Sequence, residues 1–497
     1  RPRVTTVRHI LIALVAVAAS CGLTALATPS TVWASTAPQL GPLNPAFVEA
    51  LHDPQVALGL GRLPSPVEVS VSRKAGARAA RAMLPTRYSL VEAGLVTRPV
   101  KDQGADATCW AFANVAALES AILKRQGRST DLSENDLVRR SGFWSTRTQR
   151  YAWGGYDFMA VAYFARWAGP VRETDDPYGR YRAPTPKRGK TVRHVQGVVM
   201  IPGRRSSLDN DLVKGLVMEN GALSVGMCWD DAAFDTAVDD EGTHSTHYLP
   251  EEREENHGVA VVGWDDAYPA ERFQGMYGPP PAPGAFLVRN SWGADWGSDG
   301  YLWVSYYDAA FARDMGLGTW GGCTSYAAVA DIGDYSRNYG HDKLGVTGRV
   351  GYPDGGPVWA ANRFTAASRR PIRAVGFYTL SSDTPYEVWA GPSLKQLTRR
   401  AKGVSALPGY TTVRLRTPLK VVKGRKFVVA IRLASPDGSY PLAVERGRRI
   451  PLGNSRVVFA ATGASRGQSY VGAKRWRLKD LTLSLPRTNV CLKAFAD

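Results

Sequence analysis

A cysteine, a histidine and two side-chain amides are the residues of this sequence whose types suggest nucleophilic chemistry. Cys109 stands in "PVKDQGADATCWAF", His257 in "NHGVAVVGW" and Asn290 in "LVRNSWGADWG". A nucleophilic thiol needs a base that takes its proton and a third group that orients the base. Gln103 adds an amide that can donate a hydrogen bond to a developing oxyanion. If the fold brings these residues together, they predict acyl transfer through a thioester.

The residues after Cys109 predict a helix that positions the thiol. Apolar residues recur there at helical spacing: Ala111, Val115, Leu118 and Ile122. Lys124 and Arg125 suit the negative end of such a helix, and Gly127 suits the position just past it. Cys109 is thus expected in or beside the first turn, where free N–H groups favour a thiolate.

Short apolar segments farther along the chain predict strands that carry the other two groups. These segments are "GALSVGMCW", "HGVAVVGW", "GAFLVRN" and "GYLWVSYY", and a second helical face covers 156–168. The mixture predicts an α+β domain with an antiparallel sheet. Three loops have the composition of insertions: "PTPKRGKTVRH", "YGPPPAPG" and an acidic stretch, Asp230 to Glu255, which we expect to be solvated.

Five segments within residues 84–310 carry a resemblance to the papain family of cysteine peptidases. They are "PVKDQG…CWAF", "LSENDLV", "GGYDFMAVAY", "NHGVAVVGW" and "NSWGADWGSDGY", in the order of the family. The resemblance implies a two-lobed α+β domain over 84–330 that hydrolyses peptide bonds. It makes Cys109 the nucleophile, His257 the base and acid, and Asn290 the orienting group. Gln103 and the Cys109 N–H would form the oxyanion hole.

The same resemblance assigns three further residues and reveals one departure. Trp292 would shield the His–Asn bond from water, and Gly154 and Gly155 would line the substrate cleft. A plain turn at the glycine pair and an inert, packed cysteine are the structural alternatives. The family usually has a disulfide whose two positions here hold Asp106 and Ala152. One disulfide is therefore expected to be absent, with the site intact.

The amino-terminal region reads as an export signal followed by a spacer. Residues 1–34 hold basic residues, the apolar run "ILIALVAVAAS" and small residues typical of a signal peptide. The alternatives are a membrane anchor over 10–27 and a lipoprotein at Cys21. Residues 35–83 are expected to be a pro-segment or linker. After signal cleavage no stable membrane span is expected, and the protein would be secreted or held at the cell surface.

Residues 331–497 differ from the rest of the chain in pattern and charge. They hold 29 basic and 10 acidic residues, against 33 and 34 in residues 1–330. Short alternating segments separated by Gly, Pro, Ser or Asp predict an all-β sandwich of jelly-roll type without helices. "WAANRFTAAS", "AVGFYTLSSDTPYEVW" and "NVCLKAF" make the region similar to the lectin-like domain that follows papain-type domains in some bacterial and archaeal surface proteins.

These observations favour a secreted cysteine endopeptidase acting on protein or peptide substrates. The basic sandwich would hold an anionic glycan, a cell-wall polymer or the catalytic domain itself, or merely keep the protein soluble. No nucleic-acid recognition motif is present, and no cofactor or metal is expected, because neither HExxH nor paired-cysteine spacing occurs. The alternative function is a catalytically idle papain-fold adhesin or glycan-binding surface protein.

Overall fold

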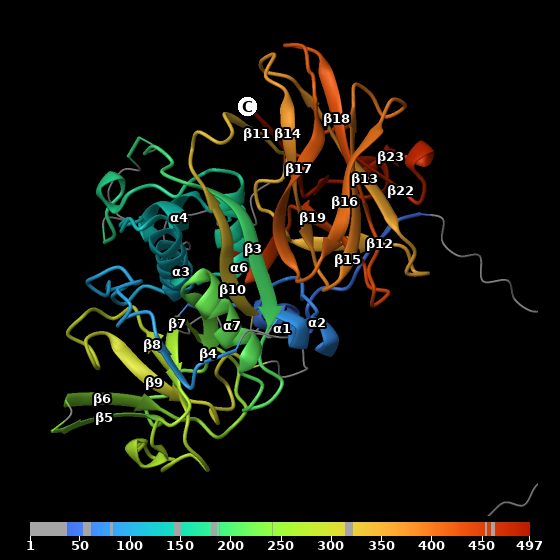
Figure 1. The fold of residues 1–497 in the computed structure, drawn as a ribbon. Helices are drawn as coiled ribbons and strands as arrows, with labels where there is room; N and C mark the ends of the chain where they lie inside the picture. The colour runs from blue at the N-terminus through green and yellow to red at the C-terminus, as the bar shows by residue number, and fades with distance from the viewer. Residues whose placement is uncertain are drawn as a thin grey trace, which may run out of the picture. The chain divides into compact units, whose positions relative to one another are not determined.

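A single sheet runs through both expected domains of the chain (Figure 1). The computed structural model describes residues 37–52, 61–79, 83–143, 151–179, 186–187, 189–240, 242–313, 322–452, 455–458 and 463–497. The expected export signal at 1–34 lies outside the described residues.

Residues 84–330 contain helices and a largely antiparallel sheet, as predicted. The helices are α3 (Cys109–Gln126), α4 (Glu134–Arg140), α6 (Asp157–Ala165) and α7 (Asp211–Asn220), with 3-10 turns η2 (Glu173–Asp175) and η3 (Ala270–Arg272). The strands are β2 (Arg87–Ser89), β3 (His194–Pro202), β4 (Leu223–Met227), β5 (Phe234–Asp239), β6 (Gly242–His247), β7 (His257–Asp265), β8 (Ala285–Arg289), β9 (Tyr301–Ser305) and β10 (Gly322–Ala330).

Strand β7 lies inside the sheet, and its sequence explains this position. All residues of "HGVAVVGW" are buried, as in a strand that is covered on both faces. Strands β4 and β8 pair with its two edges, both antiparallel, and α3 packs against it. The strand that begins at the candidate base is therefore held on three sides.

Two apolar cores correspond to the two expected lobes. One core lies among α3, α4 and α6, and the other lies among β4, β7, β8 and β9. The helical core also includes Tyr378, Tyr410 and Phe495, which belong to the carboxyl-terminal third of the chain. That third thus completes a core of the catalytic half.

The acidic stretch between 230 and 255 is not a solvated loop throughout, which corrects the sequence prediction. Strands β5 and β6 form an antiparallel hairpin there, and β6 pairs in parallel with β9. Small and polar residues alternate in "FDTAV" and "GTHSTH". Such residues suit this hairpin, because only the carboxyl-terminal end of β6 is buried. The insertion therefore extends the catalytic sheet at its edge.

The carboxyl-terminal third is an all-β domain apart from short helical turns. Its strands are β11 (Arg337–Tyr339), β12 (Gly348–Gly351), β13 (Val358–Thr365), β14 (Ile372–Thr379), β15 (Thr384–Gly391), β16 (Thr398–Ser405), β17 (Gly409–Leu419), β18 (Lys426–Leu433), β19 (Leu442–Arg446), β20 (Arg449–Leu452), β21 (Ser455–Val458), β22 (Ser469–Gly472), β23 (Lys479–Asp480), β24 (Thr488–Val490) and β25 (Leu492–Ala496). The helix α8 (Leu481–Ser484) and the turn η4 (Arg475–Arg477) were not expected. The Asp480 side chain accepts the Thr482 N–H at 3.0 Å and so caps α8.

The segment "NVCLKAF" was predicted as one strand but forms two. Strand β24 pairs with β19 in a four-stranded sheet, whereas β25 pairs with β14 and β11 in the long sheet. The chain changes sheets at Cys491. The buried Asn362 amide donates to the Val490 and Leu492 carbonyls at 3.0 and 2.8 Å and satisfies both at this crossing.

A direct strand pairing joins the two halves. In the long sheet the order is β11-β25-β14-β17-β3-β10-β4-β7-β8-β9-β6-β5, and β2 pairs with β7. The junction is β17 against β3, with Gly409 opposite Val199 and Thr411 opposite Gly197. A six-stranded sheet, β16-β15-β18-β13-β22-β23, packs against the β14 and β17 end to make the sandwich core.

The amino-terminal segment contacts both halves. Strand β1 (Gln39–Leu40) pairs with β12 of the sandwich, and helix α1 (Pro45–His52) follows. Farther on, the Ser70 N–H donates to the Leu380 carbonyl at 2.9 Å, and helix α2 (Arg73–Ala79) packs beside α7 (Figure 1). Among the described residues no helix is long and apolar enough to cross a membrane.

We expect Gly409→Val to separate β17 from β3. Gly409 has φ +136°, and a Cβ there would lie 2.0 Å from the Val198 carbonyl oxygen. Strain and overlap of this kind should lower the free energy of unfolding by about 2–4 kcal/mol. Urea unfolding measures this loss, with Gly333→Ala as the control because nothing lies within 4 Å of its Cβ position. Equal stability of the two variants would contradict the junction.

Candidate active site

Helix α3 places the thiol where the sequence predicts it. Cys109 is the first residue of the helix, and Gly127 closes the other end with φ 63°. Lys124 and Arg125 lie in the last turn. The Cys109 side chain is thus beside the unpaired N–H groups of the first turn.

The pairing of β7 with β8 brings the imidazole to the amide. His257 begins β7, and Asn290 directly follows β8. His257 Nε2 lies 2.8 Å from Asn290 Oδ1, which also accepts the Ser291 N–H at 2.8 Å. The Trp292 ring stacks on the imidazole at a centroid distance of 4.9 Å. The His–Asn bond is therefore covered by an aromatic ring.

The tautomer of His257 follows from these bonds. Because Asn290 Oδ1 faces a backbone N–H, it is the oxygen of the amide and can only accept. His257 Nε2 must therefore donate, and Nδ1 keeps its lone pair. Nδ1 has no hydrogen-bond partner among the described residues.

The thiol lies next to this imidazole without a hydrogen bond to it. Cys109 Sγ instead accepts the N–H of Gly258, the residue after His257, at 3.2 Å. The sequence alone did not indicate this resting arrangement.

The Gln103 carboxamide is held in a fixed orientation near the start of α3. Its Oε1 accepts the Ser291 hydroxyl at 2.6 Å, and its Nε2 donates to the Asp106 carbonyl at 2.8 Å. The Gln103 backbone N–H also donates to the Ser291 carbonyl. The loop that carries Asn290 therefore positions the candidate oxyanion donor as well.

Residues 61–67 of the amino-terminal segment, called the occluding segment below, cover the site. The Gly155 N–H donates to the Gly61 carbonyl at 3.0 Å, and the Leu63 N–H donates to the Gly155 carbonyl at 2.9 Å. The neighbouring glycine, Gly154, lies against the Gly61 backbone. Cys109 and His257 are both 0% exposed. The predicted substrate cleft is thus occupied by the chain itself.

Burial governs the electrostatics of the covered site. It raises the pKa of the Cys109 thiol to about 12, although the Gly258 N–H bond and the Arg62 charge oppose this shift. It also lowers the pKa of His257 to about 4, against the hydrogen bond to Asn290. Near pH 7 both groups are therefore neutral in this arrangement. The closed site holds a thiol and an imidazole, not an ion pair.

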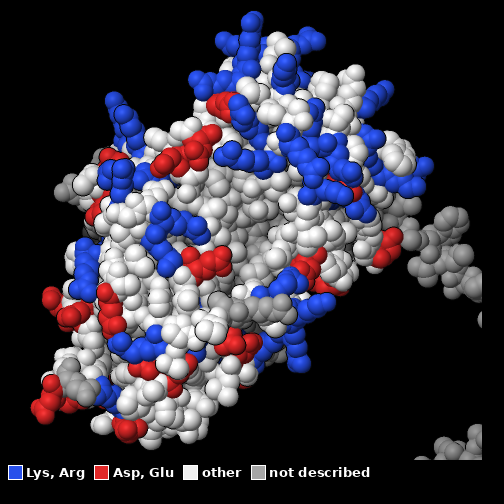
Figure 2. All heavy atoms as spheres, viewed as in Figure 1, with Lys and Arg blue, Asp and Glu red and all other residues white. Residues whose placement is uncertain are grey.

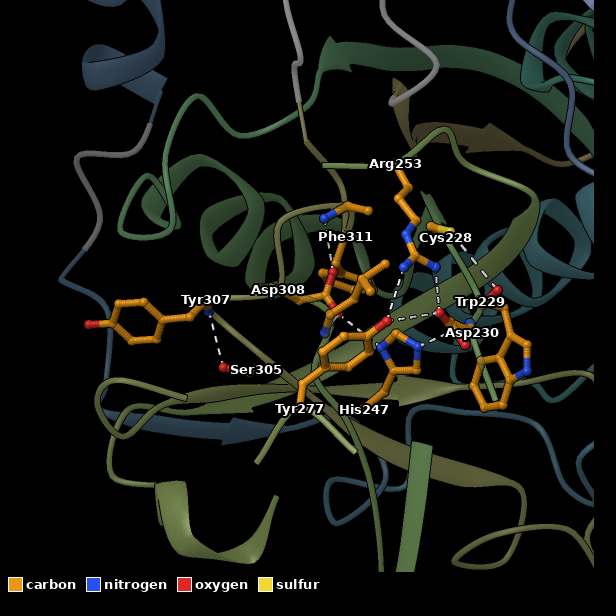
Figure 3. Close-up of polar contacts among 12 residues, drawn as sticks. Cys228, Trp229, Asp230, His247, Arg253, Tyr277, Ser305, Tyr307, Asp308 and Phe311 are labelled. Atoms are coloured by element: carbon orange, nitrogen blue, oxygen red, sulfur yellow. Dashed lines mark hydrogen bonds and ion pairs between the residues drawn. The ribbon is translucent and has the colours of Figure 1, made fainter. Parts of the chain in front are cut away.

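A second buried histidine lies close by but has no free nitrogen (Figure 3). His247 Nδ1 lies 2.9 Å from Asp308 Oδ2, and its Nε2 accepts the Asp230 N–H at 3.4 Å. Its ring stacks on Trp229, which in turn meets Trp292 edge to face at 4.7 Å. His247 is therefore a structural residue that supports the aromatic cover of the site.

Neither a disulfide bond nor a metal-ion site is present among the described residues. Cys228, Cys323 and Cys491 are buried and free, as is Cys109. Within the described ranges, no group of three or more His, Cys, Asp or Glu side chains is arranged to hold a metal ion.

Comparisons with known proteins agree with this geometry. Residues 84–313 match the model of the papain family cysteine proteases, and residues 338–496 match the lectin-like domain model. Residues 84–313 therefore form a papain-family cysteine protease domain. The papain-family part of the chain is 26% identical over 258 residues to cysteine proteinase 3 of Entamoeba histolytica, covering 52% of this chain and 73% of that protein. It is 30% identical to cysteine proteinase 15A of Pisum sativum, covering 44% of this chain and only 57% of the pea protein.

The two-domain architecture also has a solved counterpart. The protease and lectin-like domains of Cwp84, a surface layer associated protein of Clostridium difficile, superpose with a TM-score of 0.75 at 24% identity. The match covers 93% of this chain and 99% of that one. A Cwp84 structure after propeptide cleavage matches at a TM-score of 0.68 and 26% identity, over 82% and 98%. The papain-like domain followed by a lectin-like β-domain is thereby confirmed as the fold.

Sequence reasoning missed several residues around the site. Asp157, two residues after Gly155, and Glu255, two residues before His257, are both buried beside the occluding segment. Their closeness to those two residues was a signal that could have found them. Trp229 had no such signal, because its contacts depend on the tertiary fold.

Displacing the occluding segment should change the reactivity of Cys109. We expect slow alkylation by iodoacetamide at pH 8, because a raised pKa leaves little thiolate. Gly61→Val should accelerate it and move its pH profile down toward ordinary thiol values, since a Cβ at Gly61 would lie 2.3 Å from the Ala107 carbonyl carbon. Mass spectrometry of the Cys109 peptide measures the rate. Gly333→Ala is the control, and identical profiles for all three proteins would contradict the occlusion.

Proposed function

We propose that the protein is a secreted cysteine endopeptidase that is made as a precursor. The observation that carries the proposal is the His257–Asn290 bond of 2.8 Å beside a thiol at the start of a helix. This arrangement provides a nucleophile, a base whose Nδ1 keeps its lone pair, and an orienting group. The match to the papain family model supports the same reading.

In the proposed mechanism, each step of peptide hydrolysis is assigned to a residue of the site. His257 Nδ1 takes the Cys109 proton, and the thiolate attacks the carbonyl carbon of the scissile bond. The oxyanion accepts hydrogen bonds from Gln103 Nε2 and the Cys109 N–H. The protonated His257 then gives its proton to the leaving amine, so that an acyl-enzyme remains. Finally His257 deprotonates a water molecule, which attacks the thioester and releases the acid.

We also propose that residues 35–83 form an inhibitory pro-segment. The backbone bonds of Gly61 and Leu63 to Gly155 occupy the cleft, and the nucleophile is fully buried beneath them. Hydrolysis then requires that this segment be cleaved and released. The existence of a Cwp84 structure after propeptide cleavage supports this interpretation. Residues 84–330 and 331–497 would be the catalytic and lectin-like domains of the mature protein.

We also propose that the protein is exported and acts at the cell surface. The signal-like composition of residues 1–34 supports secretion, and the similarity to a surface layer associated protein supports action at a cell surface. Protein or peptide chains at that surface are the proposed substrates.

The lectin-like domain is proposed to hold an anionic glycan or cell-wall polymer. Figure 2 shows Lys and Arg crowded over the part of the surface that the sandwich occupies in Figure 1. A groove on this domain is lined by Arg363, Lys426 and Arg466, together with the aromatic rings of Tyr339 and His341. Basic and aromatic groups of this kind suit an acidic sugar polymer.

Intramolecular support is a second function of the lectin-like domain. The pairing of β17 with β3 and the contribution of Tyr378 and Tyr410 to the helical core favour it. The two functions are compatible, because the groove at Arg363 is built from other strands.

Substitutions in the triad test the proposed chemistry in the mature protein. Cys109→Ala and His257→Ala should each reduce peptide hydrolysis by roughly 10⁴-fold or more, since the nucleophile or its base is lost. Asn290→Ala should cost roughly 100-fold and leave measurable activity, because it removes only an orienting group. Initial rates on a quenched peptide measure this series. Normal turnover by Cys109→Ala would reject the proposal, and an inactive parent protein that still binds glycan would indicate the idle adhesin.

Salt dependence tests the polymer-binding proposal. The full chain with Cys109→Ala should bind a polyanion such as heparin or teichoic acid at low salt and lose most of it near 1 M. Salt shortens the Debye length to about 8 Å at physiological ionic strength and to about 3 Å at 1 M. The double variant Lys426→Glu and Arg466→Glu should weaken binding, whereas Lys74→Glu outside the groove should not. Salt-independent binding of a neutral sugar would contradict the role of charge.

A further inference from the structure

The occluding segment inserts one charged side chain into a buried acidic pocket beside the nucleophile. Arg62 Nη1 and Nη2 donate to the two Asp157 carboxylate oxygens at 2.8 and 3.3 Å, and Nη2 also donates to the Gly322 carbonyl at 2.9 Å. Arg62 Nε lies 3.5 Å from Glu255. Arg62, Asp157 and Glu255 are 3%, 5% and 2% exposed. The guanidinium is therefore bound on several sides and removed from water.

The pocket is built by the catalytic domain itself. Asp157 accepts the Asn114 amide at 2.7 Å and the Thr324 hydroxyl at 2.8 Å, so α3 and β10 hold it in place independently of Arg62. Apart from Arg62 Nε at 3.5 Å, neither carboxylate oxygen of Glu255 has a hydrogen-bond donor among the described residues. A buried carboxylate without a donor is costly. Asp157 and Glu255 thus face the space that the Arg62 guanidinium fills.

Backbone bonds on both sides of Arg62 direct its side chain into this space. The Gly155 N–H donates to the Gly61 carbonyl, and the Leu63 N–H donates to the Gly155 carbonyl. These bonds involve only main-chain atoms of the occluding segment, so any extended peptide can form them. A peptide bound along Gly155 therefore presents one side chain to Asp157 and Glu255.

We propose that this pocket selects substrates with an arginine at the position that Arg62 occupies in the precursor. The inference rests on the proposed peptidase function, and it names a specificity pocket made by Asp157, Glu255 and the Gly322 carbonyl. The acceptors lie in different directions around the planar guanidinium. A planar fork with five donors matches such a set, whereas a lysine ammonium concentrates its donors on one atom. Arginine is therefore preferred to lysine, and both to neutral residues.

Burial and the Arg62 charge act on Glu255 in opposite directions. Burial raises the pKa of Glu255 to about 8, and the Arg62 charge opposes the shift while Asp157 adds to it. When the guanidinium leaves, the group that stabilises the charged carboxylates is lost. A second guanidinium, from a substrate, restores that stabilisation.

Peptide profiling of the mature protein tests the pocket. In a library of quenched peptides that varies each position on the acyl side of the scissile bond, one position should favour Arg over Gln or norleucine by about 10- to 100-fold in kcat/KM. Glu255→Gln and, separately, Asp157→Asn should reduce this preference to a few-fold. Glu252→Gln, an exposed acid three residues from Glu255, is the matched control and should keep the preference.

The outcomes separate this inference from the proposed function. Hydrolysis that depends on Cys109 but shows no preference for Arg at any position overturns the pocket and leaves the peptidase intact. Absence of hydrolysis overturns the peptidase, and the pocket is then tested by binding. A peptide of residues 57–68 should protect Cys109 of the mature protein from alkylation about 10-fold better than the same peptide with citrulline at position 62. Equal protection by the two peptides overturns the pocket.

Discussion

The antiparallel pairing of β7 with β8, with α3 packed on β7, is the constraint on which the site depends. It sets the end of one strand beside the start of another, so that His257 Nε2 and Asn290 Oδ1 lie 2.8 Å apart. Because the Asn290 oxygen faces a backbone N–H, the same pairing also fixes the imidazole tautomer. Strand geometry thus decides which nitrogen can take a proton, before any substrate binds.

Desolvation connects the occluding segment to the chemistry. The segment excludes water from Cys109 and His257, which shifts their pKa values in the directions that favour the neutral forms. It is held by main-chain bonds to Gly155 and by the charge of Arg62. The same contacts that close the cleft therefore suppress the thiolate, and both effects end together when the segment departs.

Sequence alone determined much of the fold, because its signals are local. Apolar spacing and a terminal glycine placed α3 between Cys109 and Gly127, and unbroken apolar runs marked β4, β7, β8 and β9. The sequence did not show which strands pair when they lie far apart in the chain. The hairpin of β5 and β6, the crossing at Cys491 and the junction of β17 with β3 depend on partners far away in the chain.

The candidate site likewise has features that the sequence predicted and features that only the structure revealed. Residue types, order and context were sufficient to nominate Cys109, His257, Asn290 and Gln103 from the sequence. Only the tertiary structure decided that the thiol rests against the Gly258 N–H, and that Arg62 meets Asp157 and Glu255. The sequence alone does not distinguish a buried carboxylate that binds a cation from an ordinary carboxylate on the surface. A carboxylate becomes a binding group only when the fold removes it from water and leaves a cation as its available partner.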